Sequence, residues 1–383
     1  MKKAYEDFIY LIRCVLAGES AQDFSCENFG ELFHIAKDHS MSNMLYYALR
    51  HNKNVPKKIA EELSELHNLI VYKSANQRVA ERELRKLMSE SGIRHIFLKG
   101  FTVNGLYPSG DMREMSDIDI LVDAYDLERV NRLLTSNGYK FDGHKGHHDV
   151  YSKEPLVSVE IHETALDHNR KTGLDEYFSD AWSIAESDGA EYKFNVIDNY
   201  IFLMGHLFGH FKEGGTGVRT VTDIGLYLKE YKDVMDWTYI NEVFKKYDVL
   251  EAMNNIADLA SAWFGDGEKT ELLDEMGEYV FGSGSYGKAS NMMMSIADEN
   301  GGKAGSIIKS VKRKLFIPAA EMRRRSKIID KCPILLPFAY VCRVFKILFG
   351  QFNELKWWMN GARKADVQAI KKHKEKMRRF GVH

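Results

Sequence analysis

Asp117-Ile118-Asp119-Ile120-Leu121-Val122 is a short apolar run interrupted by two carboxylates, and it decides the fold. Side chains alternate across a β-strand with a period of two, so a strand here places Asp117 and Asp119 on one face. Two ionised carboxylates this close repel each other unless a cation lies between them. Oxygen ligands of this kind favour Mg²⁺. The run therefore predicts a metal-binding strand, although Asp-x-Asp is also a frequent surface tripeptide.

Two neighbouring segments add polar groups to this strand. Upstream, residues 93–98 form a strand-like run that ends at Lys99-Gly100. A strand that breaks at glycine before a helix offers backbone N–H groups to phosphate, with the lysine as an adjacent cation. Downstream, residues 157–162 alternate again and place Glu160 and His162 on one face. The chain thus offers a third acid on a second strand.

These segments belong to a series of short motifs between residues 90 and 225, namely Leu98-Lys99-Gly100, Tyr107-Pro108, Arg113, Asp117 to Val122, Gly138-Tyr139 and Val159-Glu160-Ile161-His162. The series resembles the uncharacterised nucleotidyltransferase family of the DNA polymerase β superfamily. That resemblance implies an α+β fold. A polymerase-β-like core, a small mixed sheet with helices, would be embedded in a largely α-helical protein.

The resemblance also implies roles for the matching residues. Asp117 and Asp119 would be the first two metal ligands and Glu160 the third, and the same three acids would be the catalytic residues. The ion would be Mg²⁺, with Mn²⁺ as an alternative. Lys99-Gly100 would correspond to the Gly-Ser turn with which the superfamily holds the nucleoside triphosphate.

Two features depart from the family pattern. Phe101 stands where a serine is usual, and the interval from Gly100 to Asp117 is longer than in compact members. The usual triphosphate contact is therefore incomplete. We expect Lys99 and Arg113 to supply phosphate contacts in its place.

A histidine pair lies in the following helical region. Residues 201–211 read as a helix that carries His206 and His210 four positions apart, on one face. A zinc-protease helix has Glu directly after its first histidine, and here that residue is Leu207. The family has a similar His-rich helix followed by Arg and Asp. We therefore predict that four residues face the nucleotide or the acceptor, with an interior hydrogen-bond network as the alternative: His206, His210, Arg219 and Asp223.

The predicted reaction is transfer of a nucleoside monophosphate from an NTP with release of pyrophosphate. An acceptor oxygen attacks the α-phosphate in line, and metal ions can stabilise both the entering and the leaving oxygens. The acceptor stays open between a small molecule, a protein side chain and RNA. Because the triphosphate turn is incomplete, a catalytically inactive nucleotide- or anion-binding module is the alternative function.

The C-terminal region differs from the rest of the chain in charge. Residues 303–383 carry a net charge of +16, and the remainder carries −18. Such blocks indicate intramolecular docking or an anionic partner. The apolar run 333–349 is interrupted by Arg343 and Lys346 and is too short to span a bilayer. With Trp357-Trp358 it leaves RNA or membrane-surface binding as a third possibility, but a solvated basic face is favoured.

The sequence divides into four regions. We expect an N-terminal helical region over residues 1–90, the nucleotidyltransferase core over 91–170, a helical domain over 171–302 and a basic helical region over 303–383. Its 383 residues are enough for a substantial core.

Cysteine usage and the N-terminus indicate the compartment. The start of the chain lacks a continuous apolar signal region. No close spacing for zinc or a disulfide framework occurs among the cysteines, which are Cys14, Cys26, Cys332 and Cys342. A cytoplasmic location is expected.

Two further clusters have simple structural interpretations. A polar hairpin loop explains His144, His147 and His148 better than a metal does. Residues 282–287 resemble a phosphate-binding loop but lack its Gly-Lys-Ser/Thr ending, so a connection between helices is expected.

Overall fold

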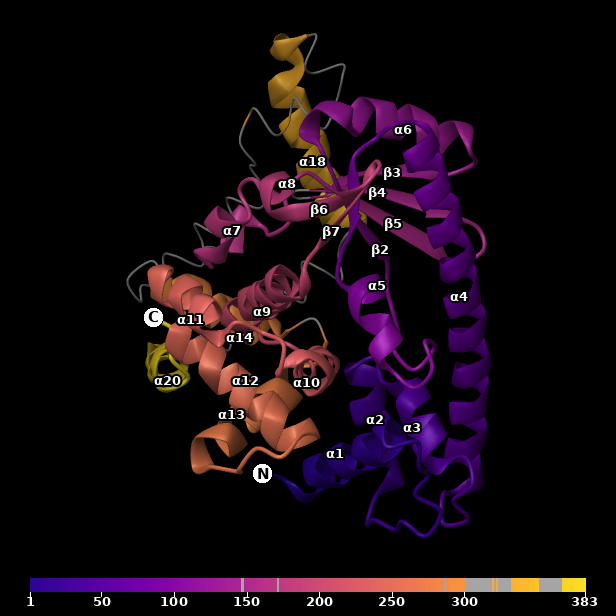
Figure 1. Ribbon diagram of the computed structural model, residues 1–383, viewed down its shortest axis with the longest axis vertical. Helices are drawn as coiled ribbons and strands as arrows, with labels where there is room; N and C mark the ends of the chain where they lie inside the picture. Colours follow the sequence, from indigo (N-terminus) through magenta and orange to yellow (C-terminus); the bar gives the residue numbers. More distant parts are fainter. Residues whose placement is uncertain are drawn as a thin grey trace. The chain divides into compact units, whose positions relative to one another are not determined.

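The chain forms two compact units, of which the first comprises residues 1–209 and 216–285 and the second 210–215 and 286–383. Figure 1 shows the computed structural model, coloured along the sequence. It describes residues 1–145, 148–170, 172–285, 287–299, 319, 322, 332–350 and 367–383. His147, Trp357-Trp358 and most of the basic C-terminal region lie outside these described residues.

The chain begins with four helices, as expected for residues 1–90. They are α1 (Lys3–Leu16), α2 (Phe29–Asp38), α3 (Ser42–Leu49) and α4 (Lys57–Glu90). In α2 an apolar face at helical spacing is buried. The side chain of Asn28 caps this helix by accepting a hydrogen bond from the backbone N–H of Glu31 at 3.1 Å. The α4 helix is long enough to run beside both the preceding helices and the sheet (Figure 1).

A mixed sheet forms the centre of the first unit. Its strands, among the described residues, follow the order β3-β4-β5-β2-β1-β7-β6. The β2–β5 and β1–β7 pairs are parallel and the others antiparallel. The bounds are β1 (His95–Phe97), β2 (Ile118–Val122), β3 (Lys140–Lys145), β4 (His148–Lys153), β5 (Val157–His162), β6 (Ala185–Asp188) and β7 (Glu191–Phe194).

This sheet confirms the mixed character expected from the sequence. The three predicted strands are β1, β2 and β5. The sheet also takes in β6 and β7, which lie beyond the range 91–170 predicted for the core. The strands β6 and β7 are only four residues long, and β6 is largely polar, so neither gives a strong alternating signal in the sequence.

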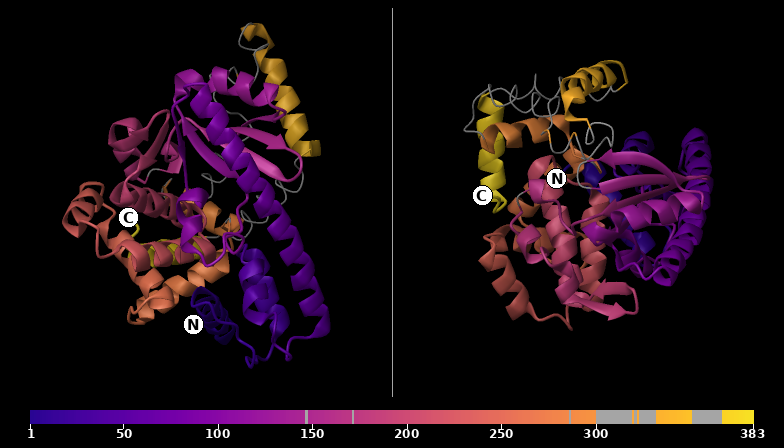
Figure 2. Two further views of the ribbon diagram at one scale, coloured as in Figure 1. Left: turned by 45° about the vertical axis from the view of Figure 1, so that its right-hand side comes forward. Right: turned by 90° about the horizontal axis from the view of Figure 1, so that it is seen from above.

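Helices α4 and α6 (Leu127–Ser136) cover one face of the sheet, as Figure 2 shows from two sides. The isoleucines of β2, Ile118 and Ile120, are fully buried in the same hydrophobic cluster as Leu84 and Met88 of α4. The alternation of β2 follows from this packing: its isoleucines meet the helices, so its acids face the other side of the sheet.

We expect Leu84→Ala to lower the free energy of unfolding by about 2–5 kcal/mol, because it empties a fully buried site. Leu69→Ala is the matched control on the same helix, since Leu69 is 53% exposed. Urea unfolding followed by circular dichroism measures both. Equal losses for the two variants would show that α4 is not anchored through this face.

The remaining helices of the first unit follow the central strands. Short turns separate β1 from β2, namely α5 (Gly100–Val103) and the 3-10 helix η1 (Asn104–Leu106). A second 3-10 helix, η2 (Ala124–Asp126), precedes α6, and η3 (His168–Arg170) follows β5. The helical region contains α7 (Leu174–Tyr177), α8 (Ala181–Ile184), α9 (Val196–Glu213), α10 (Val218–Tyr231), α11 (Trp237–Lys246), α12 (Leu250–Phe264) and α13 (Glu271–Ser283).

Helices α10 and α12 pack closely through a glycine. A Cβ on Gly225 of α10 would approach the Cβ of Phe264 to 2.9 Å, which no ordinary contact allows. This close packing fixes α10, the helix that carries Arg219 and Asp223.

The described part of the second unit is helical. It contains α14 (Ala289–Glu299), the 3-10 helix η4 (Pro333–Leu335), α18 (Leu336–Gly350) and α20 (Val367–Arg379). The α14 and α20 helices are joined by a 3.1 Å hydrogen bond between Ser295 Oγ and His373 Nε2. The expected connection between helices after residue 282 is present, because α13 ends at Ser283 and α14 follows.

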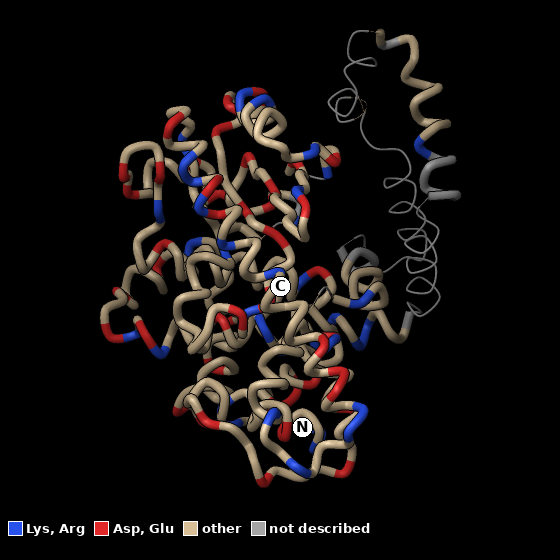
Figure 3. The backbone as a smooth tube through the Cα atoms, turned by 90° about the vertical axis from the view of Figure 1, so that its right-hand side faces the viewer, with Lys and Arg blue, Asp and Glu red and all other residues tan. Residues whose placement is uncertain are grey.

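Charge varies along the described chain. Figure 3 shows basic and acidic residues interspersed over the first unit. The sequence of α18 contains Arg343 and Lys346 and no acid. None of the described helices is both long and apolar enough to cross a membrane.

Candidate active site

The structure brings the three predicted acids to one face of the sheet. Asp119 lies in the buried centre of β2, and Asp117 comes directly before that strand. Because β2 and β5 run parallel, with Asp119 opposite Glu160, the side chains of these two residues share a face. Asp117 is two residues from Asp119 and joins the same side. The alternation in the sequence therefore predicted this grouping correctly.

Asp119 is the most strongly engaged of the three acids. Its Oδ1 accepts hydrogen bonds from Lys99 Nζ and from His162 Nε2, each at 2.8 Å. Burial opposes ionisation of this carboxyl, but the positive charge of Lys99 and the bond from His162 outweigh it and hold the pKa of Asp119 well below its ordinary value. Asp119 is accordingly an anion throughout the physiological range.

Asp117 behaves in the opposite way. Burial raises its pKa to about 7, and the negative charges of Asp119 and Glu160 act in the same direction. Burial acts to raise the pKa of Glu160, but the hydrogen bond with His148 and the charges of His148 and His162 together hold it below its ordinary value. The three carboxylates lie close enough to act on one another's ionisation, and a cation bound among them would relieve that repulsion.

The Lys99-Gly100 turn has an unusual backbone. Lys99 has φ of 47° and ψ of −102°, a conformation that non-glycine residues rarely adopt. Thr102 supports the turn by donating its hydroxyl to the Lys99 carbonyl at 2.7 Å. A Cβ on Gly100 would lie 2.5 Å from Met115 Sδ, so a larger residue here would have to displace the Met115 side chain from the loop before β2. The turn directs the Lys99 side chain to Asp119.

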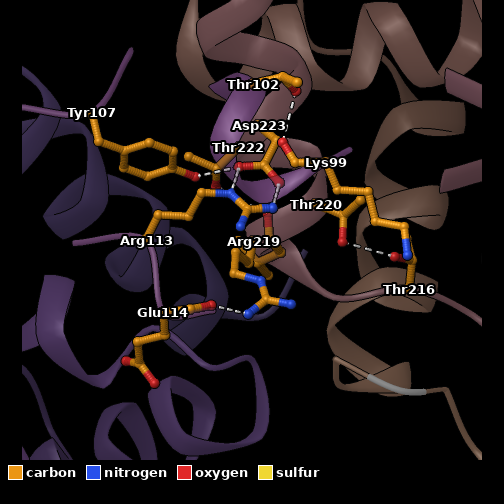
Figure 4. A network of polar contacts seen from close by, with 11 residues as sticks. Lys99, Thr102, Tyr107, Arg113, Glu114, Thr216, Arg219, Thr220, Thr222 and Asp223 are labelled. Atoms are coloured by element: carbon orange, nitrogen blue, oxygen red, sulfur yellow. Dashed lines mark hydrogen bonds and ion pairs between the residues drawn. The ribbon is translucent and has the colours of Figure 1, made fainter. Parts of the chain in front are cut away.

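Arg113 and Asp223 contact each other in a buried network (Figure 4). Arg113 donates from Nε and Nη2 to the two oxygens of Asp223, at 2.8 Å each, and Tyr107 donates its hydroxyl to the same carboxylate at 2.8 Å. Burial alone would lower the pKa of Arg113, but the charge of Asp223 raises it above its ordinary value. No local pattern predicts that these two residues, both expected to bind the nucleotide, pair with each other across 110 positions. Their pairing fastens the loop between η1 and β2 to α10.

Arg219 lies one turn before Asp223 on α10. Its Nη1 donates to the carbonyl oxygen of Glu114, and its Nε is buried without a hydrogen-bond partner among the described residues (Figure 4). Its positive charge acts to lower the pKa of Asp117. Arg219 therefore lies near enough to Asp117 to act on its charge, and its role in nucleotide binding stays a prediction.

Lys73 is a site residue that sequence reasoning missed. It lies on α4, and its Nζ donates to the carbonyl oxygen of Ser116, next to Asp117, at 3.3 Å. Burial lowers the pKa of Lys73, while the charges of Asp117 and Glu114 act to raise it. Nothing around Lys73 in the sequence marks it, since the contact joins residues 43 positions apart.

His162 is a second residue beside the acids that is not among the predicted site residues. The alternation of residues 157–162 already places it on the same strand face as Glu160, so the sequence did contain a signal for it. It is buried on β5, with Nε2 at 2.8 Å from Asp119 Oδ1 and 3.6 Å from Glu160 Oε2. Burial lowers the pKa of His162.

The histidines expected in a hairpin loop lie elsewhere. His144 is on β3 and His148 on β4, so the loop expectation is wrong for both. The reason is the register: the antiparallel pairing of β3 and β4 extends to Lys145 and His148, so both histidines fall within the paired strands. His148 is directly opposite His162 on β5, and its Nε2 is 3.3 Å from Glu160 Oε1.

The predicted histidine pair, His206 and His210, lies on α9. His206 is half-buried, with its ring 6.4 Å from that of Phe202. His210 lies one turn later, at the start of the second unit. Their contact with a nucleotide stays a prediction.

A family model described as uncharacterised nucleotidyltransferase matches residues 25–265. The chain belongs to this family. The matched range contains α2, the whole sheet, α10 and every site residue of the first unit discussed above. Membership classes the protein as a nucleotidyltransferase, an enzyme that moves a nucleoside monophosphate. Searches of curated proteins and of solved structures gave no match.

Proposed function

We propose that this nucleotidyltransferase is Mg²⁺-dependent and moves a nucleoside monophosphate from an NTP to a hydroxyl-bearing acceptor, with release of pyrophosphate. The observation that carries the proposal is the shared face of Asp117, Asp119 and Glu160, where two parallel strands place three carboxylates together. The sheet would then serve as a polymerase-β-like core.

The donor set fits a hard divalent cation. All three groups offer carboxylate oxygens, which Mg²⁺ and Mn²⁺ prefer. The pKa of Asp117, raised to about 7 by its burial and by the neighbouring acids, records a repulsion that a cation would relieve. When bound, the ion would stabilise negative charge that develops on the phosphate oxygens. Asp117, Asp119 and Glu160 would hold it.

Cations at the edge of this face suit a triphosphate. Lys99 reaches Asp119, Lys73 reaches the residue before Asp117, and Arg219 acts on the charge of Asp117. Ammonium and guanidinium groups bind phosphate through charge-assisted hydrogen bonds. We assign the phosphates to these three residues. Arg113 and Asp223, which satisfy each other, act as positioning residues for the loop before β2.

Glu160 is suited to a second role toward the acceptor. It is half-buried and has a lowered pKa, so it is ionised at neutral pH and can orient an incoming hydroxyl or accept its proton. Small molecules, protein side chains and RNA all offer such a hydroxyl. Screening these three acceptor classes with the NTP that binds in the titration below identifies the acceptor.

Calorimetric titration with ATP, GTP, CTP and UTP, with and without Mg²⁺, tests the nucleotide site. We expect Mg²⁺-dependent binding of at least one NTP, and its loss in the Asp117→Asn, Asp119→Asn double variant, because two of the three anionic ligands are gone. The matched control is Asp123→Asn, Asp126→Asn, which removes the same charge just beyond the other end of β2. Unchanged binding in the Asp117/Asp119 variant would refute the assignment of the metal ligands.

One observation favours a catalytically inactive nucleotide-binding module as a second candidate. Phe101, at the usual serine position, packs against the hydrophobic cluster under the sheet, with its ring 6.0 Å from that of Phe97. It offers no hydroxyl to a phosphate. Release of pyrophosphate in the presence of the NTP that binds and a hydroxyl acceptor would decide for the transferase. Binding without release across the acceptor classes would decide for the module.

A further inference from the structure

The sheet carries a group of imidazole and carboxylate side chains beside the acids of the proposed magnesium site. Antiparallel pairing of β4 with β5 sets His148 directly opposite His162, and Glu160 lies two residues before His162 on the same face. Three strands, β4, β5 and β2, thus direct polar side chains to one place. Alternation and register alone produce this grouping.

The ligand atoms of the group are close enough to share one ion. The donor atoms of His148, Glu160 and His162 all lie within 4.8 Å of one another. Glu160 uses both oxygens, with Oε1 3.3 Å from His148 Nε2 and Oε2 3.6 Å from His162 Nε2. Donor atoms around a tetrahedral ion with bonds of about 2.1 Å lie about 3.4 Å apart. The separations of 3.3 and 3.6 Å lie close to that spacing.

A fourth donor atom is already in place. Asp119 Oδ1 lies 2.8 Å from His162 Nε2, so an ion bound at this nitrogen also meets the Asp119 carboxylate. Asp119 and His162 are 5% and 3% exposed, which limits the freedom of both side chains. The set then consists of two imidazole nitrogens and two carboxylate oxygens from three adjacent strands.

The chemistry of this set differs from that of three carboxylates. Magnesium and calcium ions prefer oxygen ligands only, whereas imidazole suits zinc, iron, cobalt, nickel and copper. Two histidines with one carboxylate are a recurrent ligand set for divalent transition metals. A site of this composition selects against Mg²⁺ even in its excess.

We infer that His148, Glu160 and His162, completed by Asp119, form a transition-metal site that prefers Zn²⁺-like ions to Mg²⁺. The inference shares two acids with the proposed magnesium site but does not require nucleotide transfer, because it concerns binding to the free protein. It adds two histidines, His148 and His162, to the acids that were predicted as metal ligands.

Binding of the metal alone tests this inference on the full chain, with any affinity tag removed because tags themselves bind these ions. Isothermal titration with Zn²⁺, and separately with Mg²⁺, gives the two affinities. Titration with Co²⁺ adds a spectroscopic readout, since its visible absorption bands report coordination by nitrogen and oxygen ligands. We expect one ion per chain, with Zn²⁺ bound at least about 100-fold more tightly than Mg²⁺ because Mg²⁺ disfavours nitrogen ligands.

His148→Ala is the deciding variant, because His148 is half-buried and is not a member of the hydrophobic cluster under the sheet. We expect its Zn²⁺ affinity to fall at least about tenfold, since even groups that only orient a ligand are worth 10–100-fold. His144→Ala is the matched control: it removes a histidine of the adjacent strand that pairs with Asp149 at 2.9 Å instead. Thermal melts confirm that both variants are folded, and His148→Asn replaces His148→Ala if the latter is not.

The outcomes are distinct. Zn²⁺ binding no tighter than Mg²⁺ binding, or a His148 variant that binds Zn²⁺ and Co²⁺ like the wild type, would overturn the inference and leave a metal-free network of histidine–carboxylate hydrogen bonds. Failure of the wild type to bind any NTP with Mg²⁺ would instead count against the proposed function and leave this result standing. The two claims can therefore fail separately.

Discussion

Asp223→Ala is expected to lower the free energy of unfolding by about 3–5 kcal/mol, the usual result of removing one member of a buried ion pair. Arg113 and Asp223 are 8% and 3% exposed, so the guanidinium would stay in the interior without its counter-ion. The Tyr107 hydroxyl would lose its acceptor as well. Urea unfolding followed by circular dichroism measures the change.

Two comparisons show whether the buried charge is the cause. Asp233→Ala, an exposed acid just beyond the end of α10, is expected to change stability by less than about 0.5 kcal/mol. The double variant Arg113→Met, Asp223→Leu removes both charges and is expected to recover most of the loss, since apolar replacement of a buried pair is often neutral. A double variant as unstable as Asp223→Ala would show that the hydrogen-bond geometry matters more than the charge.

Asp119→Asn is expected to lower the rate of pyrophosphate release by at least about 100-fold, the scale of losing one well-placed electrostatic group. Asparagine keeps the shape and one oxygen but loses the charge that holds both Lys99 and the proposed metal ion. The measurement uses the NTP that binds in calorimetry and a saturating acceptor. The loss should appear in the rate at saturating NTP and acceptor, because Asp119 acts on charge that develops in the transition state.

Asp123→Asn serves as the control for this rate measurement. Asp123 directly follows β2, pairs with Arg94 at 2.7 Å and takes no part in the carboxylate face. Its rate should match the wild type. A rate for Asp119→Asn within a few-fold of the wild type would mean that the chemistry takes place at some other face of the fold.

The alternation of apolar and polar residues within single stretches of sequence predicts the central strands of the sheet. Apolar and acidic residues alternate around Asp119 and again around Glu160, and each strand follows that pattern in the structure. The isoleucines of β2 had to face helices and its acids had to face away. Family membership, confirmed over residues 25–265, agrees with the motifs that carry these acids.

Partners of the site residues followed only from the tertiary structure. Lys73 reaches the carbonyl oxygen of Ser116, beside Asp117, across 43 residues, and Arg113 meets Asp223 across 110. No local pattern encodes such contacts, because they depend on how α4 packs against the sheet and α10 against α5 and η1. The same holds for β6 and β7, which join the sheet from beyond the predicted core.

The sequence by itself determined which strand face carries the acids, since a side-chain period of two puts the isoleucines of β2 on one face and the acids on the other. Tertiary structure alone decided what surrounds them. Strand register placed His148 opposite His162, and the turn at Lys99 directed its ammonium to Asp119. Register and turn geometry are set by hydrogen bonds between distant segments and by packing, and neither is written in the alternation of a single strand.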